Sequence, residues 1–271
     1  MRKWFARILI AAFAASLLAC GGTNDSEKDA SVPAADTAEA GDIRSHFEKA
    51  SAYVESLIDT TGMEVLTDEE DSEFLCRTWM YEKFISLPEI GREVTVDGKT
   101  IVIGETKVRD LPELGFEVAK FADELGPYEA TSVSLQKGRK TFILSPQTND
   151  TDRTLPLDDL PIFSFSATYS EDVIPFSYYG TDERTTLEDL IARWGIPNSS
   201  IRVTADSYGT YIELSYQSET ADQDWITSDA LTFSLNYRPE AGIACLFTVG
   251  LDHYYYQIGE GVCMDEPEPE V

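Results

Sequence analysis

Four short turn signals constrain this chain more than any other feature of its sequence. They are Asp97-Gly98, Lys137-Gly138, Tyr208-Gly209 and the segment Pro239–Gly242, and each lies between runs rich in β-branched or aromatic residues. Glycine readily adopts the positive φ angles that tight hairpin turns require, and the flanking runs alternate as half-buried strands do. The sequence therefore predicts at least four antiparallel hairpins.

Amphipathic segments predict helices beside these strands. Residues 42–60 carry apolar side chains at helical spacing, and Thr185-Thr186-Leu187-Glu188 is a capping box before a second apolar stripe that ends at Gly195. The segment 73–87 fits a buried helix slightly better than a strand, and 254–258 suggests an edge strand. We thus expect an α+β fold, with an N-terminal helix and antiparallel sheet whose short helices pack on one face.

The folded region divides into two similar halves, 42–172 and 173–264. Gly104 and Gly115 bracket a short capped helix in the first half, and Gly180 and Gly195 do the same in the second, and the two closing glycines are 80 positions apart. This predicts a duplicated helix-plus-hairpin unit, although unrelated short helices that end in glycine would give the same pattern. Residues 265–271 form a disordered acidic tail in this prediction.

The first twenty residues have the tripartite pattern of an export signal. Arg2, Lys3 and Arg7 precede the apolar stretch 8–18, and small residues follow. Eleven residues in a helix reach only about 16 Å, against roughly 30 Å of bilayer hydrocarbon, so we do not expect a permanent span.

The end of this segment, Leu17-Leu18-Ala19-Cys20, resembles the lipobox of bacterial lipoproteins. The resemblance implies cleavage after residue 19, a lipid on Cys20 and attachment to the lipid bilayer, with 20–41 as a flexible tether. An ordinary secretory signal that contains a cysteine is the alternative. Gly21, rather than aspartate, follows the cysteine, which departs from the family's signal for retention in the inner membrane. The resemblance thus implies the extracytoplasmic face of the cell membrane, or the outer membrane where the host has two.

The charge of the mature chain excludes some partners. Three of the 21 basic residues lie in 1–19, so 18 basic side chains would remain against 49 acidic ones, a net charge of −31. Such a chain is not expected to bind nucleic acid or to lie on an anionic lipid surface. Solubility is the simplest explanation, and attraction to a basic partner or to divalent cations is the alternative.

Within residues 173–250, six residues cap and pack a short helix that is followed by hairpins: Gly180, Leu187, Leu190, Trp194, Gly195 and Pro197. This unit resembles the helix-hairpin units of β-lactamase-inhibitor-like and outer-membrane assembly lipoproteins. The whole chain also resembles lipoproteins of unknown function from Gram-positive gut bacteria. The resemblance implies a sheet face that binds other proteins.

No sequence motif indicates catalysis. His46 and His253 are the only histidines, and the chain has neither an HExxH nor a GxSxG pattern, nor a phosphate-binding glycine loop. We therefore predict no enzymatic activity, no catalytic residue, no metal and no cofactor.

Three cysteines remain after Cys20, and they allow at most one internal disulfide. Cys245 and Cys263 are the predicted pair, because the strands between them can bring them together, while free buried thiols are the alternative. Cys76 is left over.

Tyrosines supply the candidate contact residues. Adjacent tyrosines point to opposite faces of a strand, so some of Tyr178, Tyr179, Tyr254, Tyr255 and Tyr256 should be exposed. Core aromatics with solvated hydroxyls are the alternative. The sequence thus predicts a membrane-anchored lipoprotein that binds another protein or an envelope component. A solute- or cation-binding lipoprotein and an envelope hydrolase are the alternatives.

Overall fold

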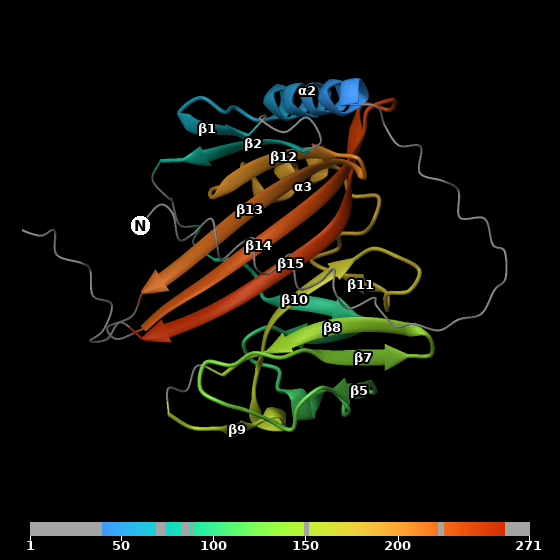
Figure 1. The fold of residues 1–271 in the computed structure, drawn as a ribbon. Coiled ribbons are helices and arrows are strands. Elements are labelled where there is room, and N and C mark those ends of the chain that lie inside the picture. Colours follow the sequence, from blue (N-terminus) through green and yellow to red (C-terminus); the bar gives the residue numbers. More distant parts are fainter. Residues whose placement is uncertain are drawn as a thin grey trace, which may run out of the picture. The chain divides into compact units, whose positions relative to one another are not determined.

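Ten antiparallel strands form the main sheet of the computed structural model, and strand is its dominant secondary structure (Figure 1). The structure describes residues 40–68, 74–82, 87, 89–148, 152–221 and 225–257. All of them belong to one unit, residues 37–271. The order of strands across the sheet is β1-β2-β12-β13-β14-β15-β10-β8-β7-β5.

The bounds of the elements are as follows. The α-helices are α2 (Ala40–Leu57) and α3 (Leu187–Trp194), and the 3-10 helices are η1 (Val108–Asp110) and η2 (Leu157–Asp159). The strands of the ten-stranded sheet are β1 (Met63–Asp68), β2 (Phe74–Tyr81), β5 (Glu117–Lys120), β7 (Val133–Lys137), β8 (Lys140–Pro146), β10 (Ile162–Thr168), β12 (Ser200–Asp206), β13 (Gly209–Ala221), β14 (Trp225–Arg238) and β15 (Ile243–Gln257). Two smaller sheets contain β3 (Glu93–Val96), β4 (Lys99–Val102) and β11 (Phe176–Ser177), and β6 (Glu124–Leu125) and β9 (Leu155–Pro156).

All four predicted hairpins are confirmed. They are β3-β4, β7-β8, β12-β13 and β14-β15, all antiparallel. The turn of β7-β8 is Gly138-Arg139, one residue after the expected pair, and that of β12-β13 is Ser207-Tyr208, one residue before it. Asp97 and Gly98 have φ angles of 49° and 75°, the left-handed pair that a type I′ turn needs. Local turn chemistry thus selects the strand pairs that are adjacent in sequence.

The strand order contains two runs of four strands. In the first run β5, β7, β8 and β10 are consecutive neighbours, and in the second run β12, β13, β14 and β15 are. The last strands of the two runs, β10 and β15, pair antiparallel, with Phe165 opposite Leu251. This single pairing joins the two runs into one sheet.

Helices and the small sheet containing β11, β3 and β4 pack on one side of the ten-stranded sheet, which we call the packed face. Tyr53 of α2 lies against Tyr237 of β14, with ring centroids 5.5 Å apart. Trp194 at the end of α3 lies 4.8 Å from Phe233 of the same strand. Phe176 of β11 lies 5.4 Å from Phe142 of β8. The main hydrophobic core therefore lies on this side of the sheet.

Three local expectations are wrong. The segment expected to be helical contains β2, which lies between β1 and β12 and buries Leu75 and Trp79 on the packed face. Residues 254–257 continue β15, which is an interior strand and not an edge. The N-cap of α3 is Thr186, whose hydroxyl accepts from the Asp189 backbone, so the capping box begins one residue later than expected.

Candidate binding face of the sheet

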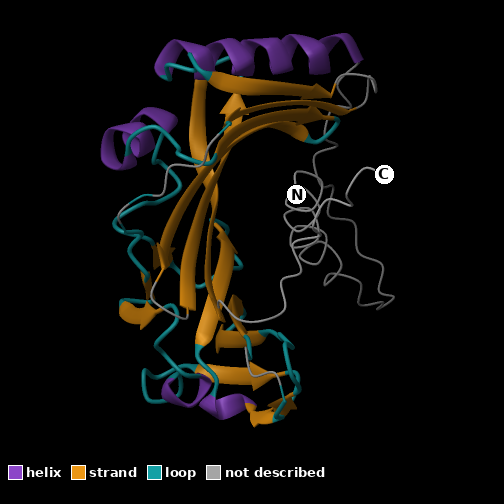
Figure 2. Ribbon diagram, turned by 90° about the vertical axis from the view of Figure 1, so that its left-hand side faces the viewer, coloured by secondary structure: helices purple, strands orange, loops and turns teal. Residues whose placement is uncertain are grey.

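The second face of the sheet, which we call the open face, follows from the alternation of side chains along the strands, which is clearest in β13. In β13, Ile212 and Leu214 are fully buried on the packed face, whereas Glu213 and Ser215 point to the other side and are partly exposed. Figure 2 shows the sheet nearly edge-on, with α3 and the connecting loops along one side of it. Neither described helix packs on the open face.

Small hydroxyl residues fill the centre of the open face. Gly250 lies between Thr232 of β14 and Ser166 of β10. A Cβ atom at Gly250 would have no neighbour closer than 3.7 Å, so this position leaves room above the sheet. Other hydroxyl residues on this part of the face are Ser164, Ser215, Ser234 and the pair Thr168 and Thr248, whose hydroxyl oxygens are 3.0 Å apart. The centre is therefore shallow and rich in hydrogen-bonding groups.

Aromatic side chains stand beside this shallow centre. Tyr254 is 40% exposed, and Phe247 is also 40% exposed. The β14–β15 register shifts between Ser234 and Leu235, and Phe247 is the extra residue of the resulting bulge. The bulge places the Phe247 ring 6.3 Å from that of Tyr211, which points to the open face. Exposed aromatic rings beside a polar surface are typical of protein interfaces.

Two desolvated carboxylates lie on the open face. Burial raises the pKa of Glu213, and the nearby Arg202 opposes this shift, with Arg202 Nη1 3.8 Å from Glu213 Oε1. Burial also raises the pKa of Asp252 to about 6, and a hydrogen bond from Ser164 opposes this shift. No cation is among the groups that perturb Asp252 in the described part of the chain. The two carboxylates thus differ in whether the fold supplies a counter-charge.

Asp252→Asn is expected to stabilise the protein by about 2 kcal/mol at pH 7.5. Asp252 binds its proton more tightly in the folded state, so its carboxylate destabilises the fold above pH 6 and ceases to do so as the pH falls toward 4. Urea unfolding of the purified chain in neutral detergent, at pH 7.5 and pH 4, measures the difference. The increase in the free energy of unfolding should vanish at pH 4, and it should be absent at both pH values in Asp123→Asn, the exposed control. Equal stability of Asp252→Asn and the unmodified chain at pH 7.5 would contradict the expectation.

The structure corrects one of the tyrosine predictions. Tyr178 is fully buried and donates its hydroxyl to the Gly91 carbonyl oxygen at 2.6 Å, so it is a core residue and not a contact residue. Tyr179 is 49% exposed, but it lies in the turn after β11 and away from the open face. Tyr254 is exposed on the open face as expected, while the side chains of Tyr255 and Tyr256 lie outside the described set.

The predicted anchor and disulfide are largely outside the described residues. Cys20 and Cys263 both lie there, so lipidation of Cys20 and the Cys245–Cys263 disulfide stay predictions. Cys245 itself is half-buried in β15, and Cys76 is half-buried in β2. Burial raises the pKa of the Cys76 thiol, which lowers its reactivity at neutral pH.

A buried His–Asp pair was not found by sequence reasoning. His253 Nδ1 lies 2.6 Å from Asp229 Oδ1, and both side chains are buried on the packed face, at neighbouring positions of β14 and β15. The His253 ring stacks on Phe163, with centroids 5.7 Å apart. No motif predicts this pair, because the two residues meet only through strand register.

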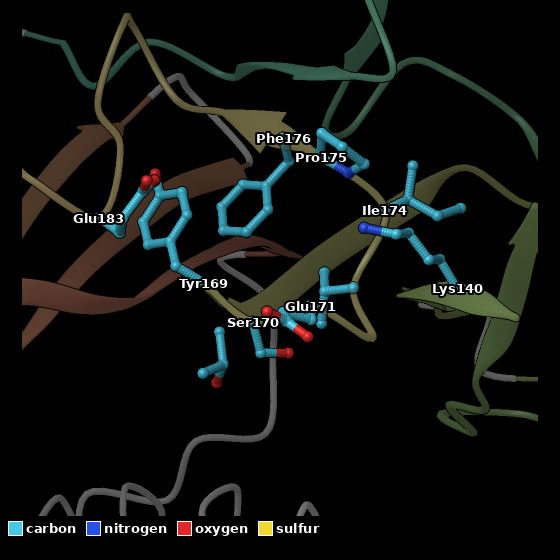
Figure 3. A pocket seen from close by; sticks show the side chains of 10 residues that line it. Lys140, Tyr169, Ser170, Glu171, Ile174, Pro175, Phe176 and Glu183 are labelled. Atoms are coloured by element: carbon cyan, nitrogen blue, oxygen red, sulfur yellow. The ribbon is translucent and has the colours of Figure 1, made fainter.

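A pocket of about 380 Å³ lies where β10 leads to β11 (Figure 3). Its walls include the rings of Tyr169 and Phe176, which stack at 4.3 Å and 10°. The Tyr169 hydroxyl is 3.0 Å from that of Thr181, and burial raises the pKa of Tyr169 to about 12. The charged side chains at the pocket are Lys140, Glu171 and Glu183.

Comparison of the chain with protein-family models, curated proteins and solved structures finds no match. Within the described residues, no helix has the length and apolar character needed to cross a bilayer. The same residues contain no group of three or more His, Cys, Asp or Glu side chains arranged to hold a metal ion.

Proposed function

We propose that this protein is a lipid-anchored, extracytoplasmic and non-enzymatic lipoprotein that binds a basic protein partner through the open face of its sheet. The observation that carries the proposal is a broad sheet face that no described helix covers and that bears an excess of carboxylates. On this face Arg202 and Arg238 accompany a larger number of acidic residues: Glu64, Asp68, Glu117, Asp206, Glu213, Glu219 and Asp252. The excess of acidic groups favours a partner with basic side chains.

We also propose how the helices are arranged on the sheet and how its two runs of strands are related. We infer an α+β arrangement in which α2 and α3 support the packed face and leave the open face to solvent. We also infer that the two runs of four strands are copies of one helix-plus-hairpin unit. Both runs follow a short helical segment, and Gly115 and Gly195 after these segments have φ angles of 91° and 77°. Two such copies joined through β10 and β15 make a face twice as wide as one copy offers.

Photo-crosslinking on intact cells tests the proposed function. A benzophenone amino acid replaces Phe247 on the open face. In a matched control it replaces Phe121, which directly follows β5 and is 72% exposed. We expect one envelope protein to be captured from position 247 and not from position 121. In a Cys20→Ala background the chain should leave the membrane fraction and the adduct should be lost. Absence of an adduct at 247, or the same adduct at both positions, would contradict the proposal.

The pocket beside Tyr169 supports a second candidate function, the binding of a small solute. An aromatic wall with one cation and two carboxylates suits a small zwitterion such as an amino acid. A thermal shift assay with a panel of free amino acids tests this candidate, with Lys140→Gln as the pocket variant. A shift in the unmodified chain that Lys140→Gln abolishes would support solute binding, and a panel without any shift would exclude amino acids as the ligand.

A further inference from the structure

We propose that Asp252 is the anchor point on the open face for one lysine or arginine side chain of the partner. The inference rests on the proposed function and identifies the part of the face on which partner recognition depends. Three observations support it: the space around Asp252, the absence of an internal counter-charge and the position of Tyr254 beside it.

The residues around Asp252 leave space for a long side chain. Across the strands its neighbours are Ala230 of β14 and Ser164 of β10. Along β15 the next residue on the same face toward the N-terminus is Gly250, which has no side chain. All three neighbours are short, so none of them extends over the carboxylate.

Tyr254 lies beside Asp252 on the open face. It is the next residue of β15 on the open face, and it is 40% exposed. Burial and the nearby Asp252 carboxylate raise the pKa of the Tyr254 hydroxyl to about 12, so the ring stays neutral at physiological pH. An aromatic ring beside a carboxylate suits a basic side chain, because the ring contacts the aliphatic stem or the cation while the carboxylate binds the charge.

The fold does not itself satisfy the charge of Asp252. A carboxylate removed from water is costly unless a cation or several hydrogen bonds compensate it. Ser164 supplies a hydrogen bond, and among the described residues no basic side chain faces Asp252 from β14, β10 or β15. Glu213 is also desolvated by burial but has Arg202 nearby. A basic side chain of the partner would supply Asp252 with a positive counter-charge, as Arg202 does for Glu213.

Binding of a cation should then depend on the protonation of Asp252. On the open face Tyr254 is the next residue of β15, whereas Glu213 and Glu219 lie two strands away on β13; His253 with Asp229 lies on the opposite face. A bound cation stabilises the carboxylate form, so the proton and the cation compete. With a free-state pKa of about 6, affinity should fall about tenfold between pH 7.5 and pH 5.

Nuclear magnetic resonance with a peptide probe tests the inference on the full chain in neutral detergent micelles. The probe is acetyl-Gly-Lys-Gly-Lys-Gly-amide, and its Nε-acetylated form is the uncharged control. We expect the lysine peptide to shift the amide signals of Gly250 and Tyr254, with affinity about tenfold lower at pH 5. Asp252→Asn should reduce the affinity for the lysine peptide at pH 7.5 by at least tenfold and remove its pH dependence. Asp123→Asn should keep the affinity and the pH dependence of the unmodified chain.

Two outcomes would overturn the inference: equal binding by Asp252→Asn and the unmodified chain, or no preference for the lysine peptide over its acetylated form. Crosslinking from position 247 in cells separates this failure from failure of the proposed function. If Asp252→Asn gives an undiminished adduct, the partner binds but Asp252 is not its anchor point. If the unmodified chain gives no adduct, the proposed function itself is wrong.

Discussion

Tyr178→Ala is expected to lower the free energy of unfolding by about 4 kcal/mol. The side chain is fully buried, and its ring lies within 6.4 Å, centroid to centroid, of those of Phe165, Trp194 and Phe233. Truncation removes these contacts and leaves a cavity, and buried aromatic-to-alanine changes cost about 3–5 kcal/mol. It also leaves the Gly91 carbonyl oxygen without the hydroxyl that donates to it.

Urea unfolding followed by tryptophan fluorescence measures this effect, and two variants serve as controls. Tyr178→Phe keeps the ring and loses the hydrogen bond, so it should cost about 1 kcal/mol. Tyr208→Ala removes a side chain that is 87% exposed and should change stability by less than about 0.5 kcal/mol. A loss below 1 kcal/mol for Tyr178→Ala would mean that this tyrosine is not part of the core.

Asp229→Ala is expected to lower the free energy of unfolding by about 3 kcal/mol. The change leaves His253 buried without the carboxylate that lies 2.6 Å from its Nδ1 atom. Removal of one partner from a buried, charge-assisted pair costs about 3–5 kcal/mol, because the other polar group stays desolvated. Gly104 packs closely against the other side of the imidazole, because a Cβ atom at this position would lie 2.6 Å from His253 Cδ2. The His253 ring therefore has little room to move toward another hydrogen-bond partner.

The double variant Asp229→Ala with His253→Phe distinguishes loss of the polar pair from simple loss of packing. A phenylalanine at 253 needs no hydrogen-bond partner and retains the stacking on Phe163. We expect it to restore at least half of the stability lost in Asp229→Ala, as measured by urea unfolding. If the two substitutions are instead additive, the His–Asp interaction does not contribute as proposed.

Both substitutions concern the packed face, and their effects should be separable from partner binding. Phe233, which contacts Tyr178, lies on β14 between Thr232 and Ser234, whose side chains point to the open face. The packed core therefore holds the strands that present the open face. Substitution of Asp252 should alter binding of the proposed partner and raise the free energy of unfolding. Substitution of Tyr178 or Asp229 should mainly lower the free energy of unfolding.

The sequence alone predicted the local parts of the fold. Hairpins such as Asp97-Gly98 and the helix that ends at Gly195 follow from φ preferences and capping, which depend on a few adjacent residues. The sheet face was also foreseeable as a candidate contact surface, because alternation along β13 and the exposed Tyr254 are properties of single strands.

Tertiary structure decided everything that depends on which distant strands become neighbours. Phe74–Tyr81 has apolar residues that fit either a helix or a strand, and pairing with β1 and β12 made it a strand. Tyr178 and Tyr179 looked equivalent in sequence, and the packing around β11 buried one and exposed the other. Strand register likewise placed Asp229 against His253 on one face, and Asp252 between Ala230 and Ser164 on the other. Such pairings join residues tens of positions apart, so the residues that define the candidate site became apparent only once the sheet was assembled.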